Sequence, residues 1–294
     1  MLRVIQYNIH RFLGSDGAAT LQNITSALKP LSPDILTLNE MDITTSPTAF
    51  ETLSKSLGLP HVEFYGHVKE RYGNAILSKY PLKRIESTPL PGGTELVFPE
   101  GTKKLNGDVS KANEKHRIVR GFLVVELEYP GVGNILVGCT HLDHISIQER
   151  KIQLEYIQKS FEKNNNINNN NPIILCGDMN ALQREDYSKK QWTCLEQRAS
   201  NNAWNLPQFG DLDILTSNGF VDTNIKNESA DATYFTAPTT EKDPLYRIDY
   251  VFTKDSDRIA LSCIKSKPAT AITFSDHFPL VVDLQLEKLK QSAL

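Results

Sequence analysis

Cysteine is scarce and unpatterned in this chain of 294 residues. The four cysteines lie far apart and show no CxxC spacing: Cys139, Cys176, Cys194 and Cys263. This distribution disfavours both a disulfide framework and a zinc site. Cys139 and Cys176 each stand at the end of an apolar run, where a free thiol behaves as a small hydrophobic group. We therefore expect reduced thiols packed in the core.

Long apolar runs are also missing. No run approaches the roughly 18 residues that a membrane-spanning helix needs. The first ten residues, MLRVIQYNIH, lack the apolar segment of a secretory signal and are typical of a strand. The sequence therefore predicts an intracellular protein, cytoplasmic or nuclear, with no membrane span, and no obligate protein partner is evident.

An excess of positive charge is the third absence. The formal net charge is −3 at pH 7, and the isoelectric point is about 6.2. Proteins that coat nucleic acids rely on Lys and Arg to neutralise phosphates, so that class is disfavoured. A nuclease is still compatible with this charge, because it needs only a local basic rim and a metal.

Short apolar runs alternate with amphipathic stretches along the chain, a pattern typical of a layered α/β enzyme. Apolar runs reach towards both ends, and neither an internal repeat nor a domain boundary is visible, so residues 1–294 are expected to form one domain. The patterns predict helices at 20–28, 48–57 and 146–161. They predict strands at 2–9, 34–40, 73–81, 117–128, 133–144, 172–180, 247–253 and 279–286.

Two polar stretches interrupt this alternation. The Asn-rich run at 163–171 has low complexity and cannot bury apolar surface, so it is expected to be a surface loop. Residues 91–116 lack sustained periodicity and predict a long loop. That loop is either a solvated charged segment or a lid that reaches phosphate oxygens through its lysines, which are Lys103, Lys104, Lys111 and Lys115.

Polar side chains recur where the predicted apolar strands end, and active sites of layered α/β proteins collect at such positions. A charged or polar group beside a buried strand is costly unless it is paired or bound to metal. Each one alone could be a helix cap, a turn residue or a satisfied core histidine. Their coincidence at equivalent places favours a shared site built from Asn8, Glu40, His141, Asp178, Asn180, Asp249, Asp276 and His277.

The chemical types in this set suit a hard divalent cation and an activated water. Mg²⁺ prefers carboxylate and amide oxygens, which Glu40, Asn8 and Asp276 would supply. Asp178 and Asn180 are separated by one residue, so on an extended backbone both would point the same way. One of them could deprotonate a water while the other orients it.

The imidazoles complete this set. Asp249 would fix the tautomer of His277 and stabilise its cation. His141 is available to protonate a leaving group or to donate to a phosphoryl oxygen. A metal, a water activator and proton donors together predict in-line attack on phosphorus.

Seven motifs resemble, in order and over nearly the whole chain, those of the endonuclease/exonuclease/phosphatase (DNase I-like) superfamily. They are QYNIH at 6–10, LNE at 38–40, GNAILSKYP at 73–81, THLDH at 140–144, GDMNA at 177–181, RIDYVF at 247–252 and SDHFPL at 275–280. The resemblance implies an α/β (α+β) four-layer sandwich, in which two mixed β-sheets pack face to face with helices outside. The site would lie at one end of the sheets.

The resemblance also implies roles for individual positions. Asn8 and Glu40 match metal-site residues, His141 matches a phosphate-contacting histidine, and Asp178 with Asn180 matches the water-activating pair. Asp249 matches the carboxylate that orients the final histidine, and Asp276 with His277 matches the terminal pair. Candidates for contact with the substrate phosphate are Asn74, Arg71, Arg117 and Arg120, although surface arginines with a structural role are the simpler account.

The leading hypothesis is an Mg²⁺-dependent phosphodiesterase or nuclease, with Mn²⁺ as a possible substitute, acting on nucleic acid or a nucleic-acid adduct. The alternative is a phosphatase or phospholipase-type hydrolase of inositol phosphates or sphingomyelin. Leu96, Val97 and Phe98 in the long loop keep a lipid substrate open. A third possibility is a non-catalytic scaffold of the same fold, which the intact set of polar residues disfavours.

Overall fold

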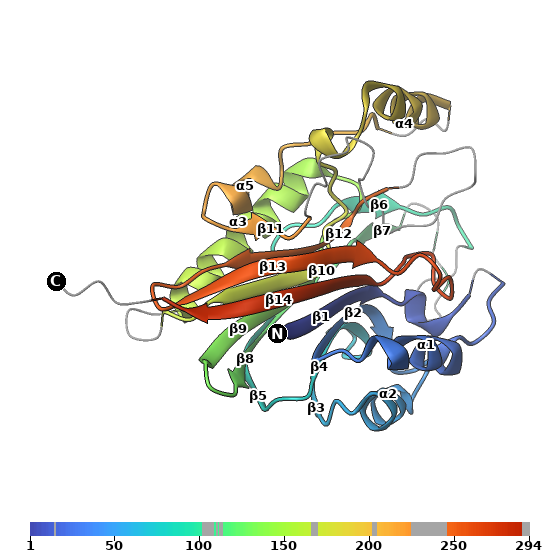
Figure 1. Cartoon of the computed structure of the whole chain (residues 1–294). Helices are drawn as coiled ribbons and strands as arrows, with labels where there is room; N and C mark the ends of the chain where they lie inside the picture. Colours follow the sequence, from blue (N-terminus) through green and yellow to red (C-terminus); the bar gives the residue numbers. More distant parts are fainter. Residues whose placement is uncertain are drawn as a thin grey trace.

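A computed structural model describes the chain at residues 1–14, 16–101, 109, 111, 114–165, 170–201, 205–224 and 246–289. Within these residues, two six-stranded mixed sheets pack face to face, and helices cover their outer faces (Figure 1). The predicted four-layer sandwich is therefore confirmed.

The first sheet has the strand order β13-β14-β1-β2-β4-β3. β1 and β2 run parallel, which brings Asn8 level with Asn39 where these two central strands end. The other neighbouring strands pair antiparallel. The strands are β1 (Leu2–Asn8), β2 (Ile35–Asp42), β3 (His61–Val68), β4 (Tyr72–Ser78), β13 (Ile259–Pro268) and β14 (Leu280–Lys288).

The second sheet has the order β11-β12-β10-β9-β8-β5. The parallel pair β9 and β10 places His141 opposite Asp178, and the antiparallel pair β10 and β12 places Asp178 opposite Asp249. Three predicted site residues are thus neighbours across adjacent strands. The strands are β5 (Leu82–Pro89), β8 (Gly121–Tyr129), β9 (Gly133–His141), β10 (Ile173–Asp178), β11 (Val221–Asp222) and β12 (Asp249–Lys254).

Helices and a small ribbon complete the described part of the chain. Figure 1 shows α1 and α2 on the outer side of the first sheet and α3 and α5 on that of the second. The α-helices are α1 (Leu21–Leu28), α2 (Ala49–Leu57), α3 (Ile147–Asn164), α4 (Lys189–Asn201) and α5 (Asp213–Thr216), and short 3-10 turns span His10–Phe12, Lys29–Leu31 and Arg184–Asp186. A separate two-stranded ribbon pairs β6 (Glu95–Val97) with β7 (Lys115–Arg117).

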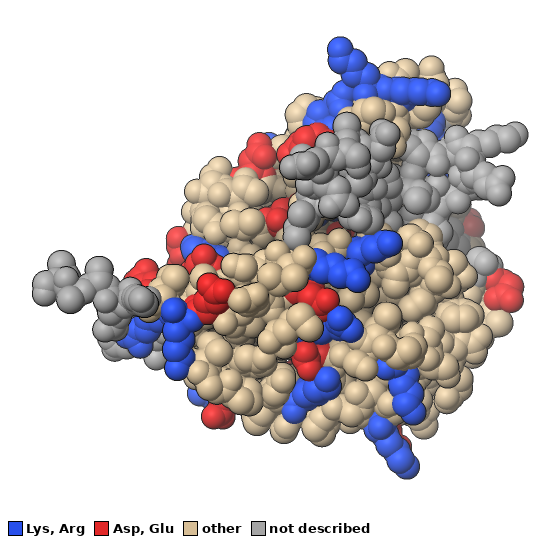
Figure 2. Space-filling model, in the orientation of Figure 1, with Lys and Arg blue, Asp and Glu red and all other residues tan. Residues whose placement is uncertain are grey.

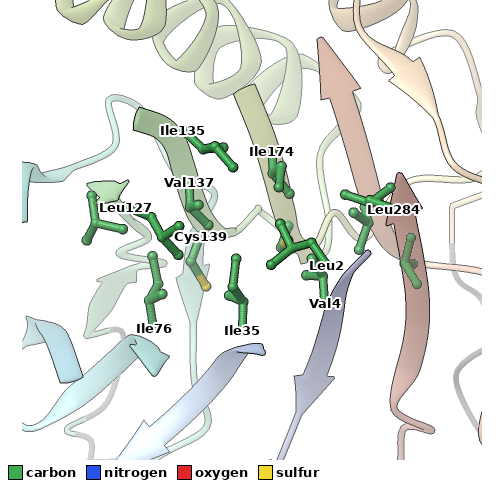
Figure 3. Close-up of a cluster of buried hydrophobic side chains, with 14 of the residues drawn as sticks. Leu2, Val4, Ile35, Ile76, Leu127, Ile135, Val137, Cys139, Ile174 and Leu284 are labelled. Atoms are coloured by element: carbon green, nitrogen blue, oxygen red, sulfur yellow. The ribbon is translucent and has the colours of Figure 1, made fainter. Parts of the chain in front are cut away.

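Three apolar layers hold the four structural layers together. The central layer lies between the sheets, where Ile35 and Ile76 of the first sheet meet Val137 and Ile174 of the second (Figure 3). A second layer joins the first sheet to α1 and α2, and a third joins the second sheet to α3 and α5. Each strand near the middle buries both faces, which explains its continuous apolar sequence. The free thiols of Cys139 and Cys176 are buried in the central layer, as predicted.

Several elements differ from the sequence-based expectation. The predicted strand at 117–128 is two strands, β7 and β8, because the chain leaves the ribbon at Ile118, which bonds to the carbonyl of Thr94. The predicted loop at 91–116 contains β6 and the start of β7. Half-buried strands β3 and β5 lack a continuous apolar run, and they and β13 were not predicted.

The Asn-rich stretch also differs slightly from expectation. Helix α3 continues to Asn164, beyond the predicted end at 161, and residues 166–169 lie outside the described part of the chain. Among the helices that are described, none has the length and apolar character to span a bilayer.

Candidate active site

Seven of the twelve predicted site residues line one pocket of about 590 Å³ where strands of both sheets end. Glu40 from β2, His141 from β9, Asp178 from β10 and His277 from the segment before β14 line it, together with Asn180. Asn8 and Asp249 lie directly behind this surface, in contact with Asp178 and His277 respectively. The convergence required by the sequence-based hypothesis is therefore present.

Asp178 is the centre of the cluster. Its side chain is only 2% exposed, and its Oδ2 atom accepts a hydrogen bond of 3.0 Å from the amide of Asn8. The same amide donates to Glu40 at 3.2 Å. Asn8 thus links the two carboxylates at the pocket floor. Burial raises the pKa of Asp178 to about 7, against the opposing effect of the nearby His277 cation.

His277 and Asp249 form the expected imidazole–carboxylate pair. The Nδ1 atom of His277 lies 2.7 Å from Oδ2 of Asp249, and its Nε2 atom lies 3.6 Å from Oδ2 of Asp178. Burial acts to lower the pKa of His277, but the two carboxylates outweigh it and raise the pKa to about 10. The imidazole is therefore a cation near neutral pH, and its Nε2–H can donate to an oxygen in the pocket.

His141 is held in a different state. Its Nδ1 atom lies 3.2 Å from the guanidinium of Arg120, which can only donate, so the ring proton resides on Nε2. That nitrogen lies 3.4 Å from Oδ2 of Asp178. Burial and the Arg120 charge hold the pKa of His141 well below its usual value. This neutral ring is suited to hydrogen-bond donation through Nε2–H rather than to protonating a leaving group.

Arg120 itself is an unusual cation. It is 7% exposed, lines the pocket, and donates to Nδ1 of His141 and, at 3.0 Å, to Nδ1 of His144. Within the described residues, no carboxylate lies within ion-pair distance of its guanidinium. A buried positive charge without a counter-ion is costly, so an anion bound in the pocket would stabilise it.

Two pocket residues have a backbone that ordinary side chains rarely adopt. Glu40 has φ 60° at an irregularity in the pairing of β2 with β4, and Asn180 has φ 48° just after β10. The expected extended arrangement of Asp178 and Asn180 is thus wrong, because the strand ends at Asp178. Instead, the backbone N–H of Asn180 donates to Asp178 at 3.0 Å, and its side-chain amide donates to the carbonyl of Leu142. Backbone strain of this kind concentrates at functional sites.

The donor set can accommodate a metal ion. One side-chain atom each of Asp178, Asp249 and His277 lies within 4.8 Å of the others, and the carboxylates are the metal ligands available there, since the imidazolium has no free lone pair. The carboxylate of Glu40 lies beside them through its bond to Asn8. Three carboxylates around one imidazolium leave a net negative charge, which a divalent cation would neutralise. Glu40 and Asn8, both predicted metal-site residues, are adjacent to this cluster.

Other predicted site residues lie elsewhere. The side chain of Asp276 is 56% exposed, 3.9 Å from His10, and is not part of the pocket surface. Arg71 is exposed in the turn between β3 and β4 and does not line the pocket either, whereas Arg117 does. Lys115 pairs with Glu95 at 2.8 Å, Lys111 is exposed, and Lys103 and Lys104 lie outside the described residues.

Asn74 is also placed differently from its prediction as a substrate contact. It is fully buried between the sheets and donates to the carbonyl of Gly121 at 2.8 Å. Its oxygen accepts from Asn39 at 2.9 Å. Asn74 therefore connects the two sheets beneath the site and does not reach the pocket surface.

Asn39 is a supporting residue that the sequence reasoning missed. Its oxygen accepts from the backbone N–H of Asp178 at 2.8 Å and from Gln6 at 2.6 Å, and its nitrogen donates to the carbonyl of Thr140 at 2.8 Å. One buried amide thus fixes the ends of β9 and β10 against β2. The only sequence signal was a second polar residue before Glu40 in an otherwise apolar strand. His144, which holds Arg120, was likewise visible only as part of the THLDH motif.

Comparisons with known proteins agree with this geometry. Residues 5–277 match the model of the Endonuclease/Exonuclease/phosphatase family. A search of curated proteins found no match.

Solved structures resemble the chain over nearly its whole length. An endonuclease/exonuclease/phosphatase from Beutenbergia cavernae is 20% identical, with a TM-score of 0.61 over 97% of this chain and 71% of that one. A mannosyl-6-phosphatase from Bacteroides thetaiotaomicron is 19% identical, with a TM-score of 0.61 over 97% and 100%. Truncated TDP2 from Caenorhabditis elegans is 16% identical, with a TM-score of 0.56 over 96% of each chain. At these identities the likeness concerns the fold.

Proposed function

The chain belongs to the endonuclease/exonuclease/phosphatase family, and from that premise we propose that it is an Mg²⁺-dependent phosphodiesterase whose substrate is a nucleic acid or a nucleic-acid adduct. Members of this family are hydrolases of phosphate esters, so the reaction class follows from membership. The choice of a diester, of Mg²⁺ and of a nucleic-acid substrate is the proposal.

One observation carries it, namely the convergence of Asp178, the His277–Asp249 pair, His141 and Arg120 on a single pocket. A carboxylate with a raised pKa stands beside three hydrogen-bond donors that are either cationic or fixed in a donating tautomer. That arrangement complements a phosphate group attacked by water, since the donors face the oxygens on which negative charge develops. A non-catalytic scaffold would have no need to keep these groups buried and facing one another.

Each residue has a distinct task in this reaction. Asp178 accepts the proton of the attacking water, and the raised pKa of its carboxyl makes it a competent base near neutral pH. The imidazolium of His277 gives its Nε2 proton to the leaving ester oxygen as the P–O bond breaks, the Nε2–H of His141 donates to a phosphoryl oxygen, and Arg120 neutralises the phosphate charge. A bound Mg²⁺, held by Glu40 with Asn8 beside it, would supply electrophilic polarisation of the phosphate.

The shape of the site supports a diester. A second cavity of about 540 Å³ shares His144 and Asn180 with the first, so the two cavities meet beside Asp178. A phosphate bound at this junction has space for a substituent on either side. A monoester would need only one of them.

The charge distribution supports local recognition of the phosphate. On the face in Figure 2, Lys and Arg side chains are interspersed with Asp and Glu. The pocket carries its own cations, Lys69, Arg117 and Arg120. A substrate recognised through one phosphate and its immediate neighbours suits this pattern better than a long duplex bound through many phosphates.

A lipid-directed hydrolase is the second candidate function, and one observation favours it. Val97 and Val119 are 56% and 42% exposed on the segment that borders the pocket mouth. Exposed apolar side chains around a pocket are typical of proteins that work at a membrane surface.

The decisive experiment compares an activated diester with the corresponding monoester. With Mg²⁺, we expect hydrolysis of bis(p-nitrophenyl) phosphate to exceed that of p-nitrophenyl phosphate by at least about tenfold in kcat/KM. EDTA should abolish activity, and added Mg²⁺ or Mn²⁺ should restore it. Full activity in EDTA would remove the metal from the mechanism, and a preference for the monoester would replace the phosphodiesterase proposal with a phosphatase.

A substrate panel then separates the candidate classes. It should contain single-stranded DNA, RNA, a 5′-tyrosyl oligonucleotide, an inositol polyphosphate, a sugar phosphate and sphingomyelin vesicles. The proposal requires one of the first three to be the best substrate. Selective hydrolysis of sphingomyelin would establish the second candidate instead.

A further inference from the structure

One wall of the pocket has no part in the chemistry described above. It is formed by the β6–β7 ribbon and the residues after it, and it is apolar and aromatic. Its pocket-lining side chains are Leu96, Phe98, His116, Ile118 and Val119, with Val68 and Tyr72 beside them. The proposed phosphodiesterase activity assigns no role to the residues of this wall.

Two aromatic rings stand together in this wall. The rings of Phe98 and His116 have centroids 5.2 Å apart and planes inclined by 37°. Tyr72, which is largely buried, is a further aromatic residue that lines the pocket, and burial raises the pKa of its phenol. Arg117, exposed beside these rings, also lines the pocket. Aromatic rings and an arginine side by side provide the flat surfaces on which planar ligands stack.

The size and charge of the pocket indicate what would lie on this wall. At about 590 Å³, the pocket is within the roughly 300–1,000 Å³ typical of sites for drug-sized ligands. A phosphate anchored on Arg120 and His277 would fill only its polar end. Most of the side chains that bound the remaining space are apolar or aromatic, with Arg117 and Lys69 among them, so the space complements a planar aromatic substituent attached to that phosphate.

We propose that the Phe98–His116 wall is a binding subsite for a planar aromatic group, either a nucleobase or an aryl ring, carried by the ester whose phosphate lies at Arg120. This inference rests on the proposed function, because it uses the same phosphate position. It goes further in naming the chemical class of the substituent and the residue that selects it. Phe98 is a binding residue in this scheme and takes no part in proton transfer.

A binding experiment tests the subsite without requiring turnover. Three phosphate monoesters share the anchoring group but differ in the substituent: methyl phosphate, phenyl phosphate and thymidine 5′-phosphate. Their dissociation constants are measured by ligand-observed NMR titration in EDTA, which prevents metal-dependent hydrolysis. We expect at least one aromatic ester to bind about fivefold more tightly than methyl phosphate. Tighter binding by thymidine 5′-phosphate identifies a nucleobase, and tighter binding by phenyl phosphate identifies an aryl group.

The variant that isolates the ring is Phe98→Leu, which keeps an apolar side chain and removes the aromatic face. It should reduce the preference for the aromatic ester to less than about twofold and leave methyl phosphate binding unchanged. Phe209→Leu is the matched control, because Phe209 is a half-exposed phenylalanine that packs on Trp192 and is not among the residues that line the pocket. This control should keep the wild-type preference.

Two outcomes would overturn the inference. One is equal affinity of wild-type protein for all three esters, and the other is a preference that survives Phe98→Leu. If, in addition, phosphatidylcholine–sphingomyelin vesicles sediment with the wild type but not with Phe98→Leu, the wall contacts lipid instead. Because all these measurements report binding, failure of the phosphodiesterase assay would be seen separately from failure of the subsite.

Discussion

The two walls of the pocket are built in different ways. The catalytic wall consists of residues at the ends of β9, β10 and β12, where Asp178, Asp249 and His141 are buried and register with one another across adjacent strands. The other wall comes from a ribbon of two three-residue strands and the residues after it, and Val97 and Val119 there are substantially exposed. An isolated ribbon of this size has little stability of its own.

The ribbon owes its position to a few side-chain bonds from the catalytic side. The carboxylate of Asp143 accepts from the backbone N–H of Thr94 at 2.8 Å, and Glu149 accepts from that of Gly93 at 2.6 Å. Asp143 precedes His144, which holds Arg120. The comparison teaches that the groups proposed for the chemistry are fixed by the two sheets, whereas the wall proposed for substrate selection is attached by hydrogen bonds. Substitutions in the two walls should therefore have different consequences.

The largest effect is expected for the base at the centre of the catalytic wall. Asp178→Asn should lower kcat for an activated phosphodiester by about 10³-fold or more, because the amide cannot accept the water proton. Asp276→Asn is the matched control, since that exposed carboxylate lies outside the pocket surface, and it should stay within about tenfold of wild type. Both are measured by steady-state kinetics with circular dichroism as a check of folding. Comparable losses in both variants would contradict the placement of Asp276.

A smaller loss is expected when the partner of His277 is changed. Asp249→Asn should reduce kcat by about 10²-fold, because the 2.7 Å bond that fixes the ring and stabilises its cation is weakened. The readout is kcat at neutral pH together with the exchangeable imidazole proton of His277 by NMR. Near-normal turnover in this variant would show that the imidazole does not need its carboxylate.

The two pocket arginines offer a third comparison, across the two walls. Arg120→Lys should raise KM by about 30-fold, because a lysine cannot reproduce the planar donor array that contacts His141, His144 and the phosphate. Arg117→Lys, at an exposed position on the ribbon, should change KM by less than about threefold. Equal effects would indicate that the phosphate is bound nearer the ribbon than we propose.

The smallest effect on activity is expected for the attachment of the ribbon, and its signature is a pH-dependent loss of stability. Four hydrogen bonds from the backbone N–H groups of Thr94, Ile145 and Ser146 and from the Thr94 hydroxyl lower the pKa of Asp143, although burial opposes them. A lowered carboxyl pKa stabilises the fold above the unfolded-state pKa, and that stabilisation is lost as pH falls through the folded-state value.

Asp143→Asn should therefore cost about 2 kcal/mol in the free energy of unfolding at pH 7 and progressively less below pH 4. Urea denaturation of the variant and the wild type between pH 7 and pH 3 measures this difference. The expected kcat at pH 7 is within about threefold of wild type, since the Asp143 carboxylate accepts from Thr94, Ile145 and Ser146 and from none of the groups proposed for proton transfer. A stability difference that is constant with pH would contradict the role of the ionised carboxylate.

Much of the catalytic wall could be predicted from the sequence because its residues follow apolar strands directly. Asp178, His141 and Asp249 were recognisable as polar groups beside buried apolar runs. The chain itself places each of them at an end of its strand. Asn180 was chosen correctly as a pocket residue but for the wrong reason, since the strand stops at Asp178 and the backbone turns. Spacing in the sequence predicts side-chain direction only while the regular element continues.

The aromatic wall and the supporting residues could not be predicted in the same way. The β6–β7 segment lacks periodicity, so nothing in the sequence distinguished Phe98, which lines the pocket, from exposed Val97 beside it. Asn39 and Asn74 stand inside two of the quoted motifs, but nothing in the sequence indicates their supporting role. Their importance comes from contacts with residues 35 to 139 positions away, made only when the two sheets pack together.

By itself, the sequence determined a layered α/β chain and the chemical identity of the groups at the strand ends, because apolar periodicity and residue type are local properties of the chain. The four-layer sandwich followed from the resemblance of its motifs to those of a known family. The tertiary structure decided which cation is buried at the pocket, Arg120 rather than Arg71, and which amides carry the site, Asn8 and Asn39 rather than Asn74. The physical reason is that burial and hydrogen-bond partners depend on how distant strands register and how two sheets face each other. Those relations arise only when the chain is folded.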